Sequence, residues 1–110
     1  MPAKFEVYQG RNKKFYFRLK ATNGQTILTG QGYKTKSGAK RGVESIRKNS
    51  GREAAFEVKT AKNGETYFNM RSTNKQIVGT SQRYKSSSGL KNGIDSVQKN
   101  APKAKVEEVG

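Results

Sequence analysis

The sequence repeats itself at a fixed offset of 51 residues, with no gap. Residues 5–49 align with residues 56–100, and Phe5-Glu6-Val7, for example, falls on Phe56-Glu57-Val58. About twenty of the 45 aligned positions are identical, which indicates an internal duplication of one structural unit. A unit of about 50 residues is near the lower size limit for an independent core. We therefore expect the two copies to share one core.

Each copy opens with alternating apolar and polar residues, the period of a β-strand. Three such stretches occupy residues 4–9, 14–21 and 25–29 of the first copy, separated by polar turns. Ile27 lies in phase with the apolar face of the third stretch. The second copy has Asn63-Gly64 between its first two stretches, which is a strong hairpin signal. The pattern predicts a three-strand meander in each copy.

The later part of each copy has the period of a helix. Its apolar or small positions are Ala39, Gly42, Val43 and Ile46 in the first copy, and Leu90, Gly93, Ile94 and Val97 in the second. Candidate N-caps are Thr35 or Ser37, and Ser86 or Ser88. A glycine on the apolar side of both helices predicts that the helix backbone lies close to the sheet.

Composition limits the chemistry that the chain can perform. With no Cys and no His, it can form neither a disulfide nor a zinc site of the Cys/His type. The usual proton-transfer side chain near neutral pH is also missing. No apolar run has the length of a signal peptide or a spanning helix. We expect a soluble, cytoplasmic protein with no metal, no cofactor and no membrane partner.

The balance of charges is strongly basic and uneven. The net charge is +15, and residues 1–51 carry 12 Lys and Arg against two acids, compared with 11 against six in residues 52–110. Only 19 of the 110 residues are Leu, Ile, Val or Phe, so the core should be thin. Such a charge favours polyanions as partners, although a solubilising surface is the simpler interpretation.

Several stretches recur in both copies and match a known pattern. In the first copy they are Tyr16-Phe17-Arg18-Leu19-Lys20-Ala21, Asn23-Gly24, Ile27-Leu28, Tyr33, Gly42, Val43 and Ile46. In the second they are Tyr67-Phe68-Asn69-Met70, Asn74, Ile77-Val78-Gly79-Thr80-Ser81, Tyr84 and Gly93-Ile94-Asp95-Ser96-Val97. With these residues, nearly the whole chain resembles the YegP-like family, small bacterial proteins of unknown function. Lys75 departs from the pattern by replacing a turn glycine.

The resemblance implies units of three strands, a helix and a strand, which form a single sheet and exchange their last strands. We therefore expect an α+β fold: two tandem β-β-β-α-β repeats in one antiparallel sheet, with two helices on one face. One domain would span residues 1–110, with repeats at about 4–51 and 55–102 and a short C-terminal strand or tail at 103–110. Because the second copy replaces a second subunit, we expect a monomer, with a swapped dimer as the alternative. The resemblance supplies no catalytic residue.

The sheet face opposite the helices is expected to combine aromatic and basic side chains. The predicted binding residues are Tyr8, Tyr16, Arg18, Lys20, Lys59, Tyr67 and Arg71, with Asn69 beside them. On a flat sheet, rings can stack on bases while Lys and Arg neutralise phosphates. This pattern predicts binding of single-stranded nucleic acid or another polyanion, although Glu6 and Glu57 are expected on the same face. The alternative is an ordinary solvated sheet face.

Other features point less clearly to function. Ser37-x-x-Lys40 and Ser88-x-x-Lys91 match a motif of some acyl-transfer enzymes, but capping explains the serines and we expect no enzyme. A second basic cluster surrounds the first helix and is interpreted as a solvated helix face; its members are Lys34, Lys36, Lys40, Arg41, Arg47 and Lys48. The alternative function is a protein-interaction or structural module that uses exposed sheet edges.

Overall fold

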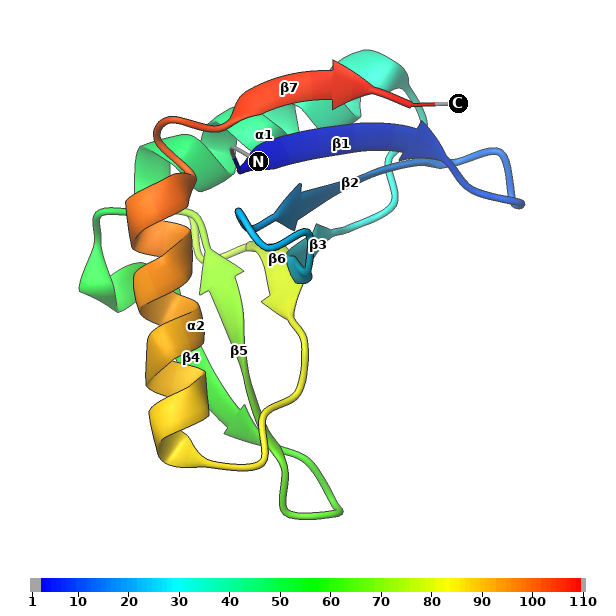
Figure 1. Cartoon of the computed structure of the whole chain (residues 1–110). Coiled ribbons are helices and arrows are strands. Elements are labelled where there is room, and N and C mark those ends of the chain that lie inside the picture. Colours follow the sequence, from blue (N-terminus) through cyan, green and yellow to red (C-terminus); the bar gives the residue numbers. More distant parts are fainter. Residues whose placement is uncertain (1–2, 110) are drawn as a thin grey trace.

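The structure is a computed structural model that describes residues 3–109 (Figure 1). Residues 1, 2 and 110 of the expected domain lie outside the described residues. The strands are β1 (Lys4–Gln9), β2 (Phe15–Lys20), β3 (Thr26–Gly30), β4 (Phe56–Thr60), β5 (Thr66–Arg71), β6 (Ile77–Ser81) and β7 (Lys105–Glu108). The α-helices are α1 (Lys36–Asn49) and α2 (Ser87–Asn100), and a short 3-10 helix, η1 (Glu53–Ala55), leads into β4.

All seven of these strands join one sheet in the order β4-β5-β6-β3-β2-β1-β7. Each repeat forms an antiparallel meander, and the two meanders meet where β3 pairs with β6. The last strand, β7, follows the helix of the second repeat but pairs with β1 of the first repeat (Figure 1). The α+β fold with tandem repeats and an exchanged last strand is therefore confirmed. The expectation of a purely antiparallel sheet was wrong in one respect: β7 runs parallel to β1, so the sheet is mixed.

The core lies between the sheet and the two helices. Helix α1 packs against β1 and β2, whereas α2 packs against β5 and β3. Phe17 of β2, Leu28 of β3, and Phe68 and Met70 of β5 contribute fully buried side chains from three strands. Figure 1 shows the strong twist of the sheet, which lets the two helices cover different parts of it. The opposite face of the sheet stays open.

Local signals place the helix starts. Thr35 is the cap of α1, and its hydroxyl accepts a hydrogen bond from the amide of Gly38 at 3.0 Å. Ser86 caps α2 in the same way through Gly89, also at 3.0 Å. Of the two candidates in each repeat, the first one is therefore used. The side chain supplies an acceptor for an amide that has no partner within the helix.

Leu28 joins Ile27 as a core residue of β3. Leu28 lies opposite Leu19, and it is fully buried. The register of β2 and β3 shifts between Leu19 and Lys20, and Ile27 is buried beside this shift. A bulge of this kind breaks the strict alternation on which the sequence pattern depends.

Candidate nucleic-acid interface

All seven predicted binding residues lie on strands that form the open face. Their places are Tyr8 on β1, Tyr16, Arg18 and Lys20 on β2, Lys59 on β4, and Tyr67 and Arg71 on β5. Their strand neighbours, such as Phe5 and Phe17, are fully buried on the helix side. Since successive side chains of a strand point to opposite faces, the predicted binding residues face away from the helices. They form two groups, one in each repeat, with β3 and β6 between them.

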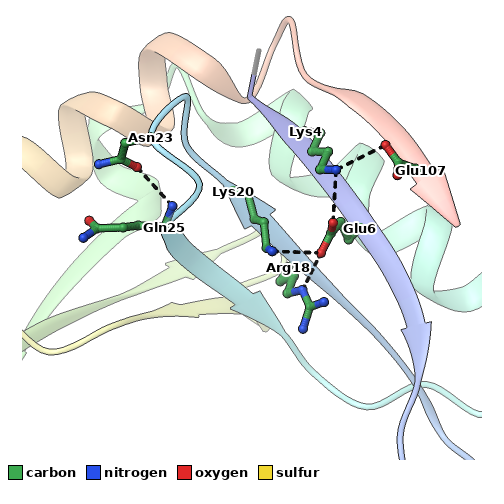
Figure 2. Close-up of polar contacts among 7 residues, drawn as sticks. All are labelled: Lys4, Glu6, Arg18, Lys20, Asn23, Gln25 and Glu107. Atoms are coloured by element: carbon green, nitrogen blue, oxygen red, sulfur yellow. Dashed lines mark hydrogen bonds and ion pairs between the residues drawn. The ribbon is translucent and has the colours of Figure 1, made fainter. Parts of the chain in front are cut away.

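The group in the first repeat is centred on the carboxylate of Glu6. Figure 2 shows Arg18, Lys20 and Lys4 converging on this carboxylate, at 2.7 Å from Nε of Arg18, 3.5 Å from Nζ of Lys20 and 3.3 Å from Nζ of Lys4. Lys4 also contacts Glu107 of β7 at 3.4 Å. Glu6 is only 5% exposed, so the three cations cover it from the solvent. We name these four residues, Lys4, Glu6, Arg18 and Lys20, the Glu6 cluster.

The electrostatics of the Glu6 cluster keep Glu6 ionised. Burial raises the pKa of Glu6, but hydrogen bonds from Arg18 and Lys4 outweigh burial and hold the pKa below its ordinary value. The pKa of Lys4 is raised, chiefly by its hydrogen bond to Glu6. Three cations around one carboxylate leave a local charge of +2. The cluster therefore keeps a net positive charge, although Glu6 reduces it.

Two tyrosines lie next to the Glu6 cluster. The rings of Tyr8 and Tyr16 stack, with centroids 5.8 Å apart and planes at 22°. The guanidinium of Arg18 lies over the Tyr8 ring, 4.5 Å from its centroid. Asn12 donates a hydrogen bond to the hydroxyl of Tyr16 at 2.9 Å. These contacts fix an aromatic pair beside cations, and we name Tyr8 and Tyr16 the tyrosine pair.

The group in the second repeat also places cations around a glutamate, but it has fewer cations and one tyrosine. Glu57 accepts hydrogen bonds from Nε and Nη2 of Arg71 at 3.1 and 2.9 Å, and Lys59 lies 3.7 Å from it. The hydrogen bonds from Arg71 lower the pKa of Glu57. Tyr67 has no tyrosine partner opposite it in the pairing of β4 and β5, because Lys59 occupies that position. The guanidinium of Arg83, which is not among the predicted binding residues, lies 5.5 Å from the centroid of the Tyr67 ring.

Three of the six members of the second basic cluster, around α1, contact the C-terminal residues. The carboxylate of Glu108 lies 2.8 Å from both Lys36 and Lys40. Arg47 donates a hydrogen bond to the carbonyl oxygen of Ala104. The Lys of the first Ser-x-x-Lys motif is therefore engaged in an ion pair with β7. The sequence placed Glu107-Glu108 in a short C-terminal strand or tail and assigned this role to neither residue.

Two further properties follow from the described part of the chain. Within residues 3–109, no three His, Cys, Asp or Glu side chains gather in a way that could hold a metal ion. None of the helices formed by these residues combines the length and the apolar character needed to cross a membrane.

The fold and the open face define a class of protein: a small tandem-repeat α+β protein with one mixed sheet and a charged, aromatic face. The family model described as "Domain of unknown function (DUF1508)" matches residues 11–57 and 61–108. The chain belongs to this family, which confirms the YegP-like resemblance.

Relatives of known sequence and structure extend over almost the whole chain. A UPF0339 protein of Stutzerimonas stutzeri is 48% identical over 100% of this chain and 99% of its own length. The UPF0339 protein YegP of Escherichia coli is 42% identical over 94% of both chains. The solution structure of YegP superposes with a TM-score of 0.92, covering 98% of this chain and 93% of that one at 42% identity. That of a UPF0339 protein of Shewanella oneidensis gives 0.91, covering 98% and 92%, also at 42% identity.

Proposed function

We propose that the protein is a non-enzymatic module that binds single-stranded nucleic acid on the open sheet face. The observation that carries the proposal is the position of the tyrosine pair beside the Glu6 cluster. Stacked rings offer a surface to unpaired bases, and adjacent Lys and Arg side chains offer charge to the phosphates. Both parts come from neighbouring strands, β1 and β2.

The expected energetics come from these two contributions. Stacking of one base on an aromatic side chain contributes about 1–3 kcal/mol. Each phosphate contact adds counterion release, so affinity falls steeply as salt rises. Glu6 and Glu57 form ion pairs with Arg18 and Arg71, and so neutralise part of the positive charge of this face. We therefore expect moderate affinity, with binding strongest at low ionic strength.

The first repeat is expected to provide most of the affinity. It has two tyrosines in contact and three cations around Glu6, whereas the second has one such tyrosine and two cations around Glu57. The overall charge also favours the first repeat, because the first 51 residues carry most of the excess of Lys and Arg. The two halves thus contribute unequally to one function.

The test is an NMR titration of the labelled protein with single-stranded RNA and DNA oligonucleotides at low salt. We expect saturable shifts at Tyr8, Tyr16, Arg18 and Lys20, with smaller shifts at Tyr67 and Arg71. Lys20→Ala should lower the affinity and reduce the salt dependence by about one phosphate contact. Lys91→Ala removes the same charge from α2 and should change neither.

Two results would overturn the proposal. One is the absence of shifts on the open face at saturating oligonucleotide. The other is an equal loss of affinity in the Lys20 and Lys91 variants, since that would show attraction by net charge alone. Either result would favour the alternative function, a protein-interaction or structural module.

A further inference from the structure

The two edges of the sheet differ in how well they are protected. One edge is β7, a strand of four residues of which three are charged. The other edge is β4, whose outermost apolar side chain, Val58, is 52% exposed. Short, charged edge strands resist pairing with other chains, whereas an edge with exposed apolar residues invites it. The β4 edge is therefore the one that can accept a further strand.

The duplication provides an internal reference for this edge. Offset by 51 residues, Phe56 and Val58 of β4 correspond to Phe5 and Val7 of β1. Phe5 is fully buried and Val7 is 2% exposed. Phe56 is partly exposed, and Val58 is the residue that stands open. The same pair of apolar side chains is thus covered in the first repeat and uncovered in the second.

The cover in the first repeat is β7. This strand pairs with β1 in parallel, with Val106 opposite Phe5 and Glu108 opposite Val7. The amide of Val109 donates to the carbonyl oxygen of Val7 at 2.9 Å, so the main chain of Val7 faces β7. The carboxylate of Glu108 then reaches Lys36 and Lys40 of α1. One strand supplies backbone pairing, an apolar side chain and an acid.

The corresponding place in the second repeat is a groove of about 370 Å³ between β4 and α2. Phe56, Val58, Leu90 and Ile94 provide its apolar lining, and its charged lining residues are Lys91, Glu53 and Asp95. Lys91 corresponds to Lys40, one of the two partners of Glu108. The groove therefore retains two of the features that hold β7 in the first repeat, an open strand and an apolar floor, whereas its charged lining is mixed.

We propose that the β4 edge binds an extended segment of a partner protein, added parallel to β4. An apolar side chain of that segment lies opposite Phe56 and packs on the apolar lining of the groove, and the side chain two residues later lies opposite Val58. This is strand addition, in which main-chain hydrogen bonds provide affinity and alternate side chains provide specificity. The inference does not depend on the nucleic-acid proposal, because the groove lies on the helix side of the sheet.

A partner protein fits this site better than a second copy of the chain. The β7 strand of any copy is already paired with its own β1 and held by Lys36, Lys40 and Arg47. Before binding another molecule it would have to leave these contacts. The second repeat also has Ser87 where the first has Lys36, and Gln98 where it has Arg47. With fewer cations, the groove depends more on its apolar lining.

The test uses a capped peptide with the sequence Ala-Lys-Val-Glu-Glu-Val, that of residues 104–109, titrated into the labelled full chain. We expect saturable NMR shifts in β4 and along the groove side of α2, with β1 unchanged. Val58→Lys should abolish them, because a charged residue at an edge opposes strand addition. Lys59→Ala, a change on the opposite face of the same strand, should leave them intact. A peptide with its valines and glutamates exchanged should not bind.

Three outcomes would overturn the proposal. Shifts confined to β1 and α1 would mean that the peptide displaces β7 and ignores the β4 edge. Shifts at β4 that depend on protein concentration without peptide would assign the groove to a second copy. No shift in either repeat at millimolar peptide would show that the edge is closed to strands. Val58→Ala provides a second variant if Val58→Lys fails to fold, and it should weaken the shifts.

Discussion

The carboxylate of Glu108 lies 2.8 Å from the ammonium of Lys40, a residue 68 positions earlier in the chain. This contact ties the C-terminal strand of the second repeat to the helix of the first. The backbone pairing of β7 with β1, which is parallel, joins the same two repeats. Through these contacts the chain closes across its two repeats.

The first prediction concerns the pH dependence of this closure. Hydrogen bonds from Lys36 and then Lys40 lower the pKa of Glu108 to about 2, from an ordinary value of 4.5. A carboxyl group with a lowered pKa stabilises the fold above its ordinary pKa, and that contribution is lost as the pH falls toward the lowered value. We expect β7 to loosen between about pH 4.5 and pH 2. Chemical shifts of Val106 and Val109 across this range provide the measurement.

Glu108→Gln is the control for this prediction. The variant should show looser β7 contacts at pH 6 and a smaller change between pH 6 and pH 2.5 than the unmodified chain. Because the Glu108 side chain is 48% exposed, salt should weaken the effect. An identical pH response in both proteins would mean that other carboxyl groups govern the docking of β7.

The second prediction compares two valines at equivalent positions. Val7→Ala removes a buried side chain and should lower the free energy of unfolding by about 1.5–3 kcal/mol. Val58→Ala changes a side chain that is 52% exposed and should cost less than about 0.5 kcal/mol. Urea unfolding measures both values. Equal costs would contradict the view that only the first repeat is covered by a closing strand.

The third prediction concerns the glycines inside the helices. A Cβ on Gly42 would collide with the Tyr33 hydroxyl and with Phe17, and a Cβ on Gly93 would collide with the ring of Tyr84. Alanine usually favours a helix by about 1 kcal/mol over glycine, but here the collisions should reverse the sign. We expect Gly42→Ala and Gly93→Ala each to lower stability by about 1–3 kcal/mol in thermal unfolding.

Gly51→Ala is the matched control, because no heavy atom lies within 4 Å of the position that its Cβ would take. It should leave stability within about 0.5 kcal/mol of the unmodified chain. A stabilised Gly42 or Gly93 variant would show that the helices can move away from the tyrosines at little cost.

Much of the fold could be predicted because it depends on local periodicity. The helix glycines illustrate this, since a small residue kept on the apolar side of both copies predicted close approach, and Tyr33 and Tyr84 occupy the space. Sequence alternation placed the seven open-face residues on their strands for the same reason. The docking of the C-terminal strand β7 on the first repeat was harder to predict. Glu108 finds its partners on α1 through a strand exchange that no local pattern encodes.

The sequence did not predict the contacts that the site residues make with one another. The sequence placed Glu6 on the open face, but not its burial under three cations, which depends on cross-strand register and on β7. Arg83 was not predicted beside Tyr67, because it comes from the connection before α2 and has no place in strand alternation. Leu28 joins Ile27 in the core beside the register shift between Leu19 and Lys20, which strict alternation does not predict.

The fourth prediction uses Glu6 to vary the charge of the proposed interface. Glu6→Gln keeps an oxygen acceptor for Arg18 but removes the negative charge beneath the cations. We expect affinity for single-stranded DNA to rise several-fold at low salt, with a steeper salt dependence. Lys20→Ala should do the opposite. Unchanged affinity in a folded Glu6→Gln variant would place nucleic acid elsewhere on the surface.

The central claim, that the tyrosine pair and the Glu6 cluster bind single-stranded nucleic acid, is tested most directly by fluorescence anisotropy. A labelled single-stranded pyrimidine oligonucleotide is titrated at low salt with the unmodified protein and with the Tyr8→Ala, Tyr16→Ala double variant, whose net charge is the same. We predict that the double variant binds roughly ten-fold or more weakly, since a stacked base contributes about 1–3 kcal/mol. Equal affinities of the two folded proteins would contradict the claim.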